Sequence, residues 1–314
     1  MLPRRLLPAT PTVFVFWILL LGTGACERSK PAVRADSVSG PAGHTPVAVT
    51  GATAASGWSR AAGLALFVQG ETRNEAIVLL PAEDDTAAFV RLGAPGSEAA
   101  EITLFGRGGA RLTAQLGPPP PAADAECRVW PLRDIHGDGA DNTWAIGFIG
   151  AQAAALPLDS VDVLSSRDSL ALAAEASRLA SAVTATTAPS FQGLRFTAHD
   201  IRRFEISPGV TALVAHLTRK VNQEANPQEE QTLLIAERDS GVTTGPYILA
   251  YAERTHGHEE TTTAPEVIGG VRIAGRPTLV VARDGDQGVA YALLERTGLR
   301  QWRIRWTSGL TRCG

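Results

Sequence analysis

The sequence predicts a β-dominated α+β protein, built from antiparallel hairpins with one amphipathic helix packed on a sheet. Short apolar runs recur between turn residues through most of the chain, which is typical of strands. Glycine-containing turns separate many of these runs and favour tight hairpins. Only one segment carries apolar residues at clear helical spacing.

The first residues have the pattern of an export signal. Arg4 and Arg5 precede the apolar run Val13–Leu21, and small residues follow. A helix of these nine residues is about 14 Å long, whereas a spanning helix crosses roughly 30 Å of hydrocarbon. We therefore expect residues 1–25 to be a signal peptide that is removed.

The segment Leu21–Cys26, L-x-x-x-A-C, resembles the lipobox of bacterial lipoproteins. In that family the cysteine sulfur receives a diacylglyceryl group and becomes the mature N-terminus, held on the membrane by acyl chains such as palmitate. Thr23 stands where leucine is usual. The resemblance implies lipidation at Cys26 and a place on the cell envelope, on the periplasmic or outer-membrane side in a diderm. The alternative is an ordinary secretory signal cut after Ala25.

Residues 26–57 are rich in Pro, Ala, Ser, Gly, Thr and Val and contain no aromatic residue. Such a stretch buries too little to offset its ordering entropy, so it predicts a flexible tether. Residues 58–117 predict a small β subdomain. It includes a hairpin in which Gly106–Gly109 joins Ile102–Phe105 to Arg111–Leu116.

A run of four prolines, 118–121, predicts a stiff linker over residues 118–125, followed by a β-rich domain at 126–314. This boundary places Cys127 and Cys313 in one domain. If Cys26 carries lipid, these two cysteines are left to form a disulfide in an oxidising compartment. The alternative is a pair of buried free thiols.

The helix is predicted over about residues 168–185, with Asp168 as N-cap and Pro189 closing it. One face of it carries Leu172, Ala176, Leu179 and Val183. After the helix, two similar hairpins form a weak internal repeat. Ala236–Asp239 precedes Tyr247–Arg254, and Ala282–Asp284 precedes Tyr291–Arg296. We expect both hairpins in one sheet system, with pairs such as Glu295-Arg296 on solvated strand faces.

The segment 134–142 is the best candidate site. Asp134, His136, Asp138 and Asn142 place ligand side chains around a glycine turn suited to Ca²⁺. It resembles the calcium loops of FG-GAP and VCBS-type repeats, D-x-N-G-D-G-x-x-D. That resemblance implies a calcium-binding loop between two strands. His136 and Asn142 depart from the pattern, and imidazole is a poor calcium ligand. The alternative is a hairpin loop whose aspartates accept backbone N–H bonds.

Other polar clusters are weaker candidates for a functional site. His256–Glu260 resembles part of a zinc site but lacks further ligands, and exposed loop is the alternative. His199 and His216 stand alone in the sequence, which favours core or surface roles over ligand roles. Gln223–Glu230 is expected to be an acidic connecting loop, with a partner-contact loop as the alternative.

Charge and motifs limit the classes of function. The net charge is −3, and removing residues 1–25 takes away two arginines, leaving −5. Without clustered Lys and Arg, no nucleic-acid partner is expected. No P-loop or G-x-G-x-x-G occurs, and Gly57–Ala61 only approximates G-x-S-x-G. A catalytic role is therefore not indicated by any motif.

These observations predict an exported, lipid-anchored cell-envelope protein. Its partners are the membrane, through the anchor, and an unidentified protein or small-molecule ligand. Its β-rich body is expected to act as a binding or structural module, with one calcium-binding loop. The alternative is an exported metal-assisted hydrolase that uses Asp134, His136 and Asp138 with His258 or Glu259.

Overall fold

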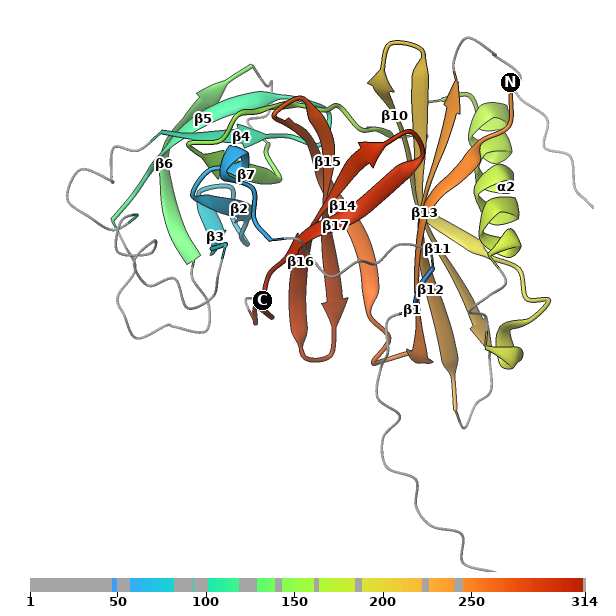
Figure 1. Ribbon diagram of the computed structural model, residues 1–314. Coiled ribbons are helices and arrows are strands. Elements are labelled where there is room, and N and C mark those ends of the chain that lie inside the picture. The colour runs from blue at the N-terminus through green and yellow to red at the C-terminus, as the bar shows by residue number, and fades with distance from the viewer. Residues whose placement is uncertain are drawn as a thin grey trace, which may run out of the picture. The chain divides into compact units, whose positions relative to one another are not determined.

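Antiparallel strands dominate the computed structural model, as predicted (Figure 1). The structure describes residues 57–81, 92, 101–118, 129–138, 143–160, 164–183, 188–221, 226–239 and 245–312, and the backbone of Val47–Val49. Within these residues no helix is both long and apolar enough to cross a membrane. The described strands form one closed barrel and two further sheets.

The barrel contains six strands in the order β2-β3-β6-β5-β4-β7. Its strands are β2 (Ala65–Gln69), β3 (Glu75–Leu79), β4 (Glu101–Phe105), β5 (Arg111–Leu116), β6 (Val129–Gly137) and β7 (Ile146–Ile149). The short 3-10 helix η1 (Arg60–Ala62) precedes β2. The β4–β5 hairpin confirms the prediction, and Gly109 in its turn has φ +87°, which favours glycine.

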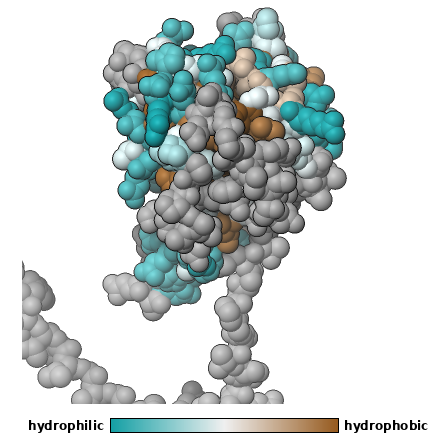
Figure 2. Space-filling model, turned by 90° about the vertical axis from the view of Figure 1, so that its left-hand side faces the viewer, coloured by the Kyte–Doolittle hydropathy of each residue, from teal (hydrophilic) through white to brown (hydrophobic). Residues whose placement is uncertain are grey.

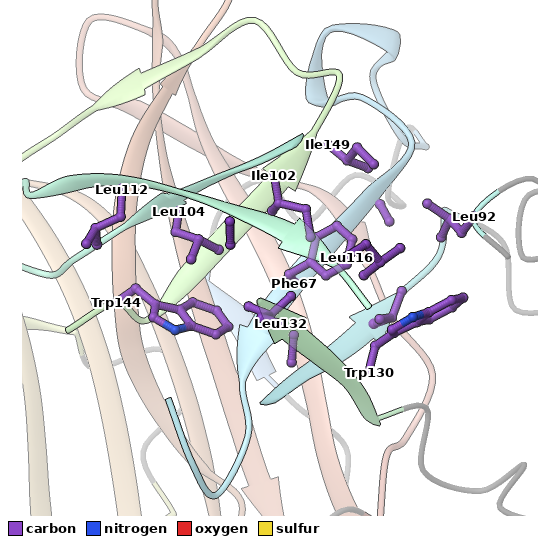
Figure 3. Close-up of a cluster of buried hydrophobic side chains, with 14 of the residues drawn as sticks. Phe67, Leu92, Ile102, Leu104, Leu112, Leu116, Trp130, Leu132, Trp144 and Ile149 are labelled. Atoms are coloured by element: carbon purple, nitrogen blue, oxygen red, sulfur yellow. The ribbon is translucent and has the colours of Figure 1, made fainter. Parts of the chain in front are cut away.

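Side chains alternate between the inside and the outside of the barrel. Phe67 points into the interior cluster, while its neighbours Leu66 and Val68 belong to a second cluster outside. Figure 3 shows the interior side chains, with Trp130 and Trp144 among them. The Nε1–H of Trp130 donates to Gly117 O at 2.7 Å, which satisfies its polar edge. The barrel is therefore filled by its own side chains.

The predicted linker at 118–125 falls between β5 and β6, which pair with each other in the barrel. Strand β6 also pairs with β3. The strands that precede and follow this segment in the chain therefore belong to the same barrel.

The two other sheets form a sandwich. The six-stranded sheet has the order β1-β13-β12-β11-β10-β9, and the five-stranded sheet has the order β17-β16-β15-β14-β8. The first contains β1 (Val47–Val49), β9 (Asp159–Ser160), β10 (Thr197–Ser207), β11 (Val210–Val221), β12 (Gln228–Asp239) and β13 (Ile248–His258). The second contains β8 (Ala153–Ala155), β14 (Ala264–Ile273), β15 (Arg276–Gly285), β16 (Gly288–Gly298) and β17 (Gln301–Thr307).

The repeated hairpins lie in different sheets, which corrects the expectation of one sheet system. The β12–β13 pair belongs to the six-stranded sheet and the β15–β16 pair to the five-stranded sheet. Their apolar faces meet in one cluster, where Leu233 and Ile235 pack with Leu279 and Val281. Similar hairpin sequences thus supply the two facing halves of one core.

Helix α2 (Ser166–Ala182) covers the other face of the six-stranded sheet (Figure 1). Ala176 and Leu179 are buried against this sheet, as the helical spacing predicts. The N-cap is Ser165 and not Asp168, because Ser165 has an extended backbone and its Oγ accepts from the Asp168 N–H at 3.2 Å. Asp168 occupies the third helical position and its carboxylate accepts from Ser165 Oγ. A second 3-10 helix, η4 (Pro189–Phe191), follows.

Strand β1 lies within the segment that the sequence predicts to be a tether. Val47–Val49 pairs antiparallel with β13, opposite Ala252–Arg254. Pairing of this kind covers the edge of the six-stranded sheet, which is otherwise open to another chain.

The barrel packs on the outer face of the five-stranded sheet. Ile146 and Phe148 of the barrel share a buried cluster with Val280 and Leu293. Gly269 permits this close approach, because a Cβ there would lie 2.8 Å from Ile146 Cδ1. The order of layers is therefore barrel, five-stranded sheet, six-stranded sheet and helix.

Two expectations about exposed charge are wrong. Glu229 and Glu230, placed by the sequence in an acidic loop, are buried in β12. Glu230 is fully buried, and its Oε1 accepts from Arg219 at 2.8 Å. Glu295 is also buried, and the neighbouring Arg296 is only 17% exposed in a 2.8 Å ion pair with Glu237. Ion pairs with arginines, Arg219 for Glu230 and Arg296 for Glu237, make such buried charges tolerable.

Candidate functional site

A cleft of about 1120 Å³ lies where the barrel rim meets the two sheets. The barrel contributes the end of β2, the β4–β5 turn and residues 143–145. The five-stranded sheet contributes Glu266 and Asp284, and the six-stranded sheet contributes His199, Asp200 and His216. Ligand sites are commonly concave surfaces at such junctions. This cleft is therefore the candidate functional site.

Strand alternation brings His216 to the cleft. On β11, Ala212 and Val214 face the five-stranded sheet in the sandwich core, while Leu213 and Ala215 face α2. His216 continues the first series, so it lies on the inner face of the sheet. The inner face is thus apolar along the sandwich core and becomes polar where it reaches the cleft.

A β-bulge brings His199 to the same place. The register between β10 and β11 shifts between Ala198 and Asp200, and Asp200 lies opposite His216. Regular alternation sends adjacent residues to opposite faces, but a bulge redirects a side chain. As a result, His199 and Asp200 both line the cleft although they are neighbours in the chain.

The ring of His216 is held from one side by a chain of polar groups. Its Nε2 lies 2.6 Å from Gln231 Oε1, and the amide nitrogen of Gln231 donates to Glu229 Oε1 at 2.8 Å. Glu229 also lies 3.6 Å from Lys220 Nζ. This chain connects the cleft wall with the surface of β11.

Burial lowers the pKa of His216 below its ordinary value. The bond to Gln231 opposes this effect, the nearby His199 adds to it, and Asp200 and Glu266 oppose it. Since the net shift is downward, His216 is neutral at neutral pH. The ring of His199 lies 5.5 Å from that of His216, and its Nε2 is 2.5 Å from Thr218 Oγ1.

Arg107 bridges the barrel and the five-stranded sheet at the edge of the cleft. Its Nε donates to Ile268 O at 3.2 Å, and its guanidinium lies 2.6 Å from Glu266 Oε1. The side chains of Arg107 and Glu266 are 41% and 49% exposed, so this ion pair adds little stability. The ion pair does neutralise Arg107, the one arginine among the residues that line the cleft.

The residues of the predicted calcium loop lie elsewhere. Strand β6 extends to Gly137, so Asp134 and His136 belong to a barrel strand, and all three of Asp134, His136 and Asp138 are exposed. His136 Nδ1 is 2.6 Å from Asp134 O, and its Nε2 is 3.0 Å from Thr113 Oγ1. Asn142 lies outside the described residues. No group of three or more potential metal ligands occurs among the residues that are described.

The second histidine cluster lies at the end of β13. His256 packs against Phe191 with ring centroids 6.3 Å apart, and Glu259 lies 2.6 Å from Lys220 Nζ. Neither His258 and Glu259 nor Asp134, His136 and Asp138 line the cleft. The described structure therefore does not gather the side chains named for the alternative hydrolase in this cleft. Cys26, Cys127 and Cys313 lie outside the described residues.

Sequence reasoning missed the cleft residues because His199 and His216 are isolated in the chain. One signal was present: in Ala212, Val214 and His216 a polar residue continues an apolar alternating series. The bulge at His199 left no comparable trace.

Comparison with known proteins identified no relative. The chain matches no protein-family model, no curated protein and no solved structure.

Proposed function

We propose that this protein is exported, anchored by lipid at Cys26 on the cell envelope, and binds a small polar ligand in the cleft between its barrel and its sandwich. The observation that carries the binding role is the cleft itself. It has a volume of about 1120 Å³, is formed by all three sheets, and is lined by imidazole, carboxylate and guanidinium groups. Pockets that bind small molecules have about this size and a few convergent polar groups.

Export and anchoring are supported by the leader sequence and the cysteine that ends it. A lipid at Cys26, followed by the segment up to about residue 57, would hold the β-rich body near a membrane surface. The surface in Figure 2 is mostly hydrophilic where residues are described, with hydrophobic side chains in small scattered spots. Such a surface suits a body in water that relies on its anchor for membrane attachment.

The anchor is tested by metabolic labelling with palmitate and by cell fractionation. The full-length protein should carry the label and sediment with membranes, whereas Cys26→Ser should lose both properties. Cys127→Ser is the matched control and should keep the label. A Cys26→Ser variant that remains labelled and sediments with membranes would exclude lipidation at this cysteine.

A bulky side chain placed in the cleft tests whether the cleft binds a ligand. A Cβ at Gly108 meets no atom within 4 Å, so Gly108→Trp adds bulk to the cleft wall without a clash at its base. A ligand that binds only the folded state raises its melting temperature. Sugars, polyamines, amino acids and aromatic acids should therefore be screened by thermal shift.

At least one of these compounds should stabilise the wild-type protein and fail to stabilise Gly108→Trp. Gln115→Trp, on an exposed strand position outside the cleft, is the control and should respond like the wild type. If no compound stabilises the wild type, or if Gly108→Trp responds equally, the cleft is not a binding site.

A further inference from the structure

The hydrogen bonds of His216 determine which of its ring nitrogens carries the proton. Glu229 can only accept, so the amide nitrogen of Gln231 faces Glu229 and the amide oxygen faces His216. That oxygen requires a donor, so Nε2 of His216 carries the hydrogen. In a neutral imidazole the other nitrogen, Nδ1, is then a bare acceptor.

This Nδ1 is available to a ligand. Among the described residues no hydrogen bond to Nδ1 is present, and it is not one of the buried, unpartnered polar atoms of the structure. It therefore reaches solvent. Because His216 lines the cleft, we place this acceptor on the cleft wall.

The charged groups near His216 in the cleft are mostly acceptors too. Asp200, Glu266 and Asp284 line the same cleft, and carboxylates only accept hydrogen bonds. The one arginine among the lining residues, Arg107, already donates to Glu266 and to Ile268 O. Among the charged groups of the described wall, acceptors therefore outnumber donors.

We propose that His216 determines the specificity of the cleft by accepting, at Nδ1, a hydrogen bond from an O–H or N–H group of the ligand. The ligand is therefore a donor-rich polar molecule, and its donors come from hydroxyl groups, as in a carbohydrate, or from an amine. This inference rests on the proposed function, because it assigns a ligand class to the same cleft. Gln231 and Glu229 are positioning residues that hold the ring.

Acidification removes the acceptor, because protonation turns Nδ1 into a donor. The titratable groups around His216 come from three strands: His199 and Asp200 on β10, Glu229 on β12 and Glu266 on β14. Since the pKa of His216 is below its ordinary value, binding should persist at neutral pH and weaken as the pH falls through that lowered pKa.

The probes are glucose for hydroxyl donors and spermidine for amine donors, each with a control that lacks donors. Dioxane replaces glucose hydroxyls by ether oxygens, and tetramethylammonium carries charge without N–H. Binding to the folded, signal-processed protein is measured by calorimetry, and the His216 ring nitrogens are followed by long-range ¹H–¹⁵N spectra. At least one probe should bind and shift the Nδ1 resonance, whereas its control should not.

Two substitutions distinguish the roles of the Nε2 and Nδ1 atoms of His216. His216→Gln keeps a polar group near the Nε2 position and should weaken binding about 3- to 10-fold, as expected for one lost hydrogen bond. His216→Asn places an amide oxygen near the Nδ1 position and should retain more of the affinity. Gln231→Met removes the acceptor for the Nε2–H and should therefore change the ¹⁵N signature of His216.

Binding of both glucose and spermidine no tighter than that of their own controls, or unchanged affinity in His216→Gln, would overturn the proposal. So would failure of both glucose and spermidine to bind. If other compounds still stabilise the wild type but not Gly108→Trp, the binding role of the cleft stands and only the assigned ligand class is wrong.

Discussion

Two ion pairs with buried carboxylates connect the two sheets of the sandwich. Glu237 of β12 receives two hydrogen bonds from Arg296 of β16, one from Trp302 Nε1 and one from the Arg300 N–H. Glu253 of β13 makes a similar two-pronged pair with Arg283 of β15. Each carboxylate is nearly inaccessible to solvent, so its arginine compensates a charge that water does not reach.

Replacing Glu237 should therefore destabilise the protein. Glu237→Gln keeps the shape but leaves a half-buried Arg296 without its counter-charge, and we expect a loss of about 3 kcal/mol in the free energy of unfolding. The matched control is Glu266→Gln, because the exposed Glu266–Arg107 pair should contribute less than about 1 kcal/mol. Urea unfolding of both variants measures the difference, and equal losses would contradict this account.

The same pair predicts a pH dependence. Burial by itself raises the pKa of Glu237, but the bonds from Arg296, Trp302 and the Arg300 N–H outweigh it and bring the pKa below its ordinary value. A lowered carboxyl pKa stabilises the folded state above the unfolded pKa, and this contribution is lost as the pH falls through the folded pKa. The stability gap between wild type and Glu237→Gln should thus shrink below about pH 4.5. A gap that is constant down to strongly acidic pH would contradict the assignment.

Calcium binding by the segment 134–142 stays a prediction. The spacing of oxygen ligands in the sequence motivates it, while Asp134 and His136 lie on a strand. If it is right, millimolar calcium should raise the melting temperature, and Asp138→Ala should abolish the rise. An unchanged melting curve at that calcium concentration would remove the metal assignment. Magnesium at the same concentration is the control.

At the scale of elements, the spacing of apolar side chains along the chain explains the predicted hairpin and the helix. Alternation of apolar residues produced β4 and β5 where the sequence predicts strands, and the spacing of Ala176 and Leu179 produced α2. The helix start differed because Ser165 offers a better cap than Asp168. Its hydroxyl and the Asp168 N–H reach each other only when the helix begins at Ser166.

Removing that cap should destabilise the protein. Ser165→Ala loses the acceptor for the Asp168 N–H, and we expect a loss of about 1 kcal/mol in the free energy of unfolding. Ser181→Ala, a matched change on an exposed position of the same helix, should be neutral or slightly stabilising because alanine favours helix. Chemical denaturation followed by circular dichroism compares them. Equal effects of both changes would place the cap elsewhere.

The far end of α2 has a cap supplied by tertiary structure. Buried Arg254 of β13 donates to Val183 O at 2.6 Å and also to Ala180 O, which accepts the Val183 N–H at 3.2 Å as well. A cation at this end of a helix is favourable. The local sequence near residue 183 does not predict that an arginine 71 positions away caps this helix.

At the scale of the whole molecule, the barrel and the sandwich share a core. Residues of β2, β3 and β7 pack with residues of β14 to β16 in one buried cluster, and Trp58 contacts Trp306 with ring centroids 4.9 Å apart. The Nε1–H of Trp306 also donates to Pro81 O at 2.8 Å. A shared core of this kind couples the stability of the two parts.

The protein should therefore unfold in a single calorimetric transition. Phe148→Ala, in the shared cluster, should lower the one melting temperature and cost about 3 to 5 kcal/mol. The control Leu310→Ala, on a side chain that is 60% exposed, should change little. Two separate transitions, of which Phe148→Ala affects only one, would show that barrel and sandwich are independent.

By itself the sequence determined part of the local structure: the two strands of the β4–β5 hairpin, the one amphipathic helix that covers a sheet, and the presence of antiparallel hairpins. These features depend on the spacing of side chains along the chain, which is visible without any contact. Tertiary structure alone decided that the repeated hairpins face each other, that Glu230 and Glu237 are buried, and that His199, His216 and Glu266 meet in one cleft. Burial and proximity depend on which distant strands pack together, and a bulge at one residue is enough to change them.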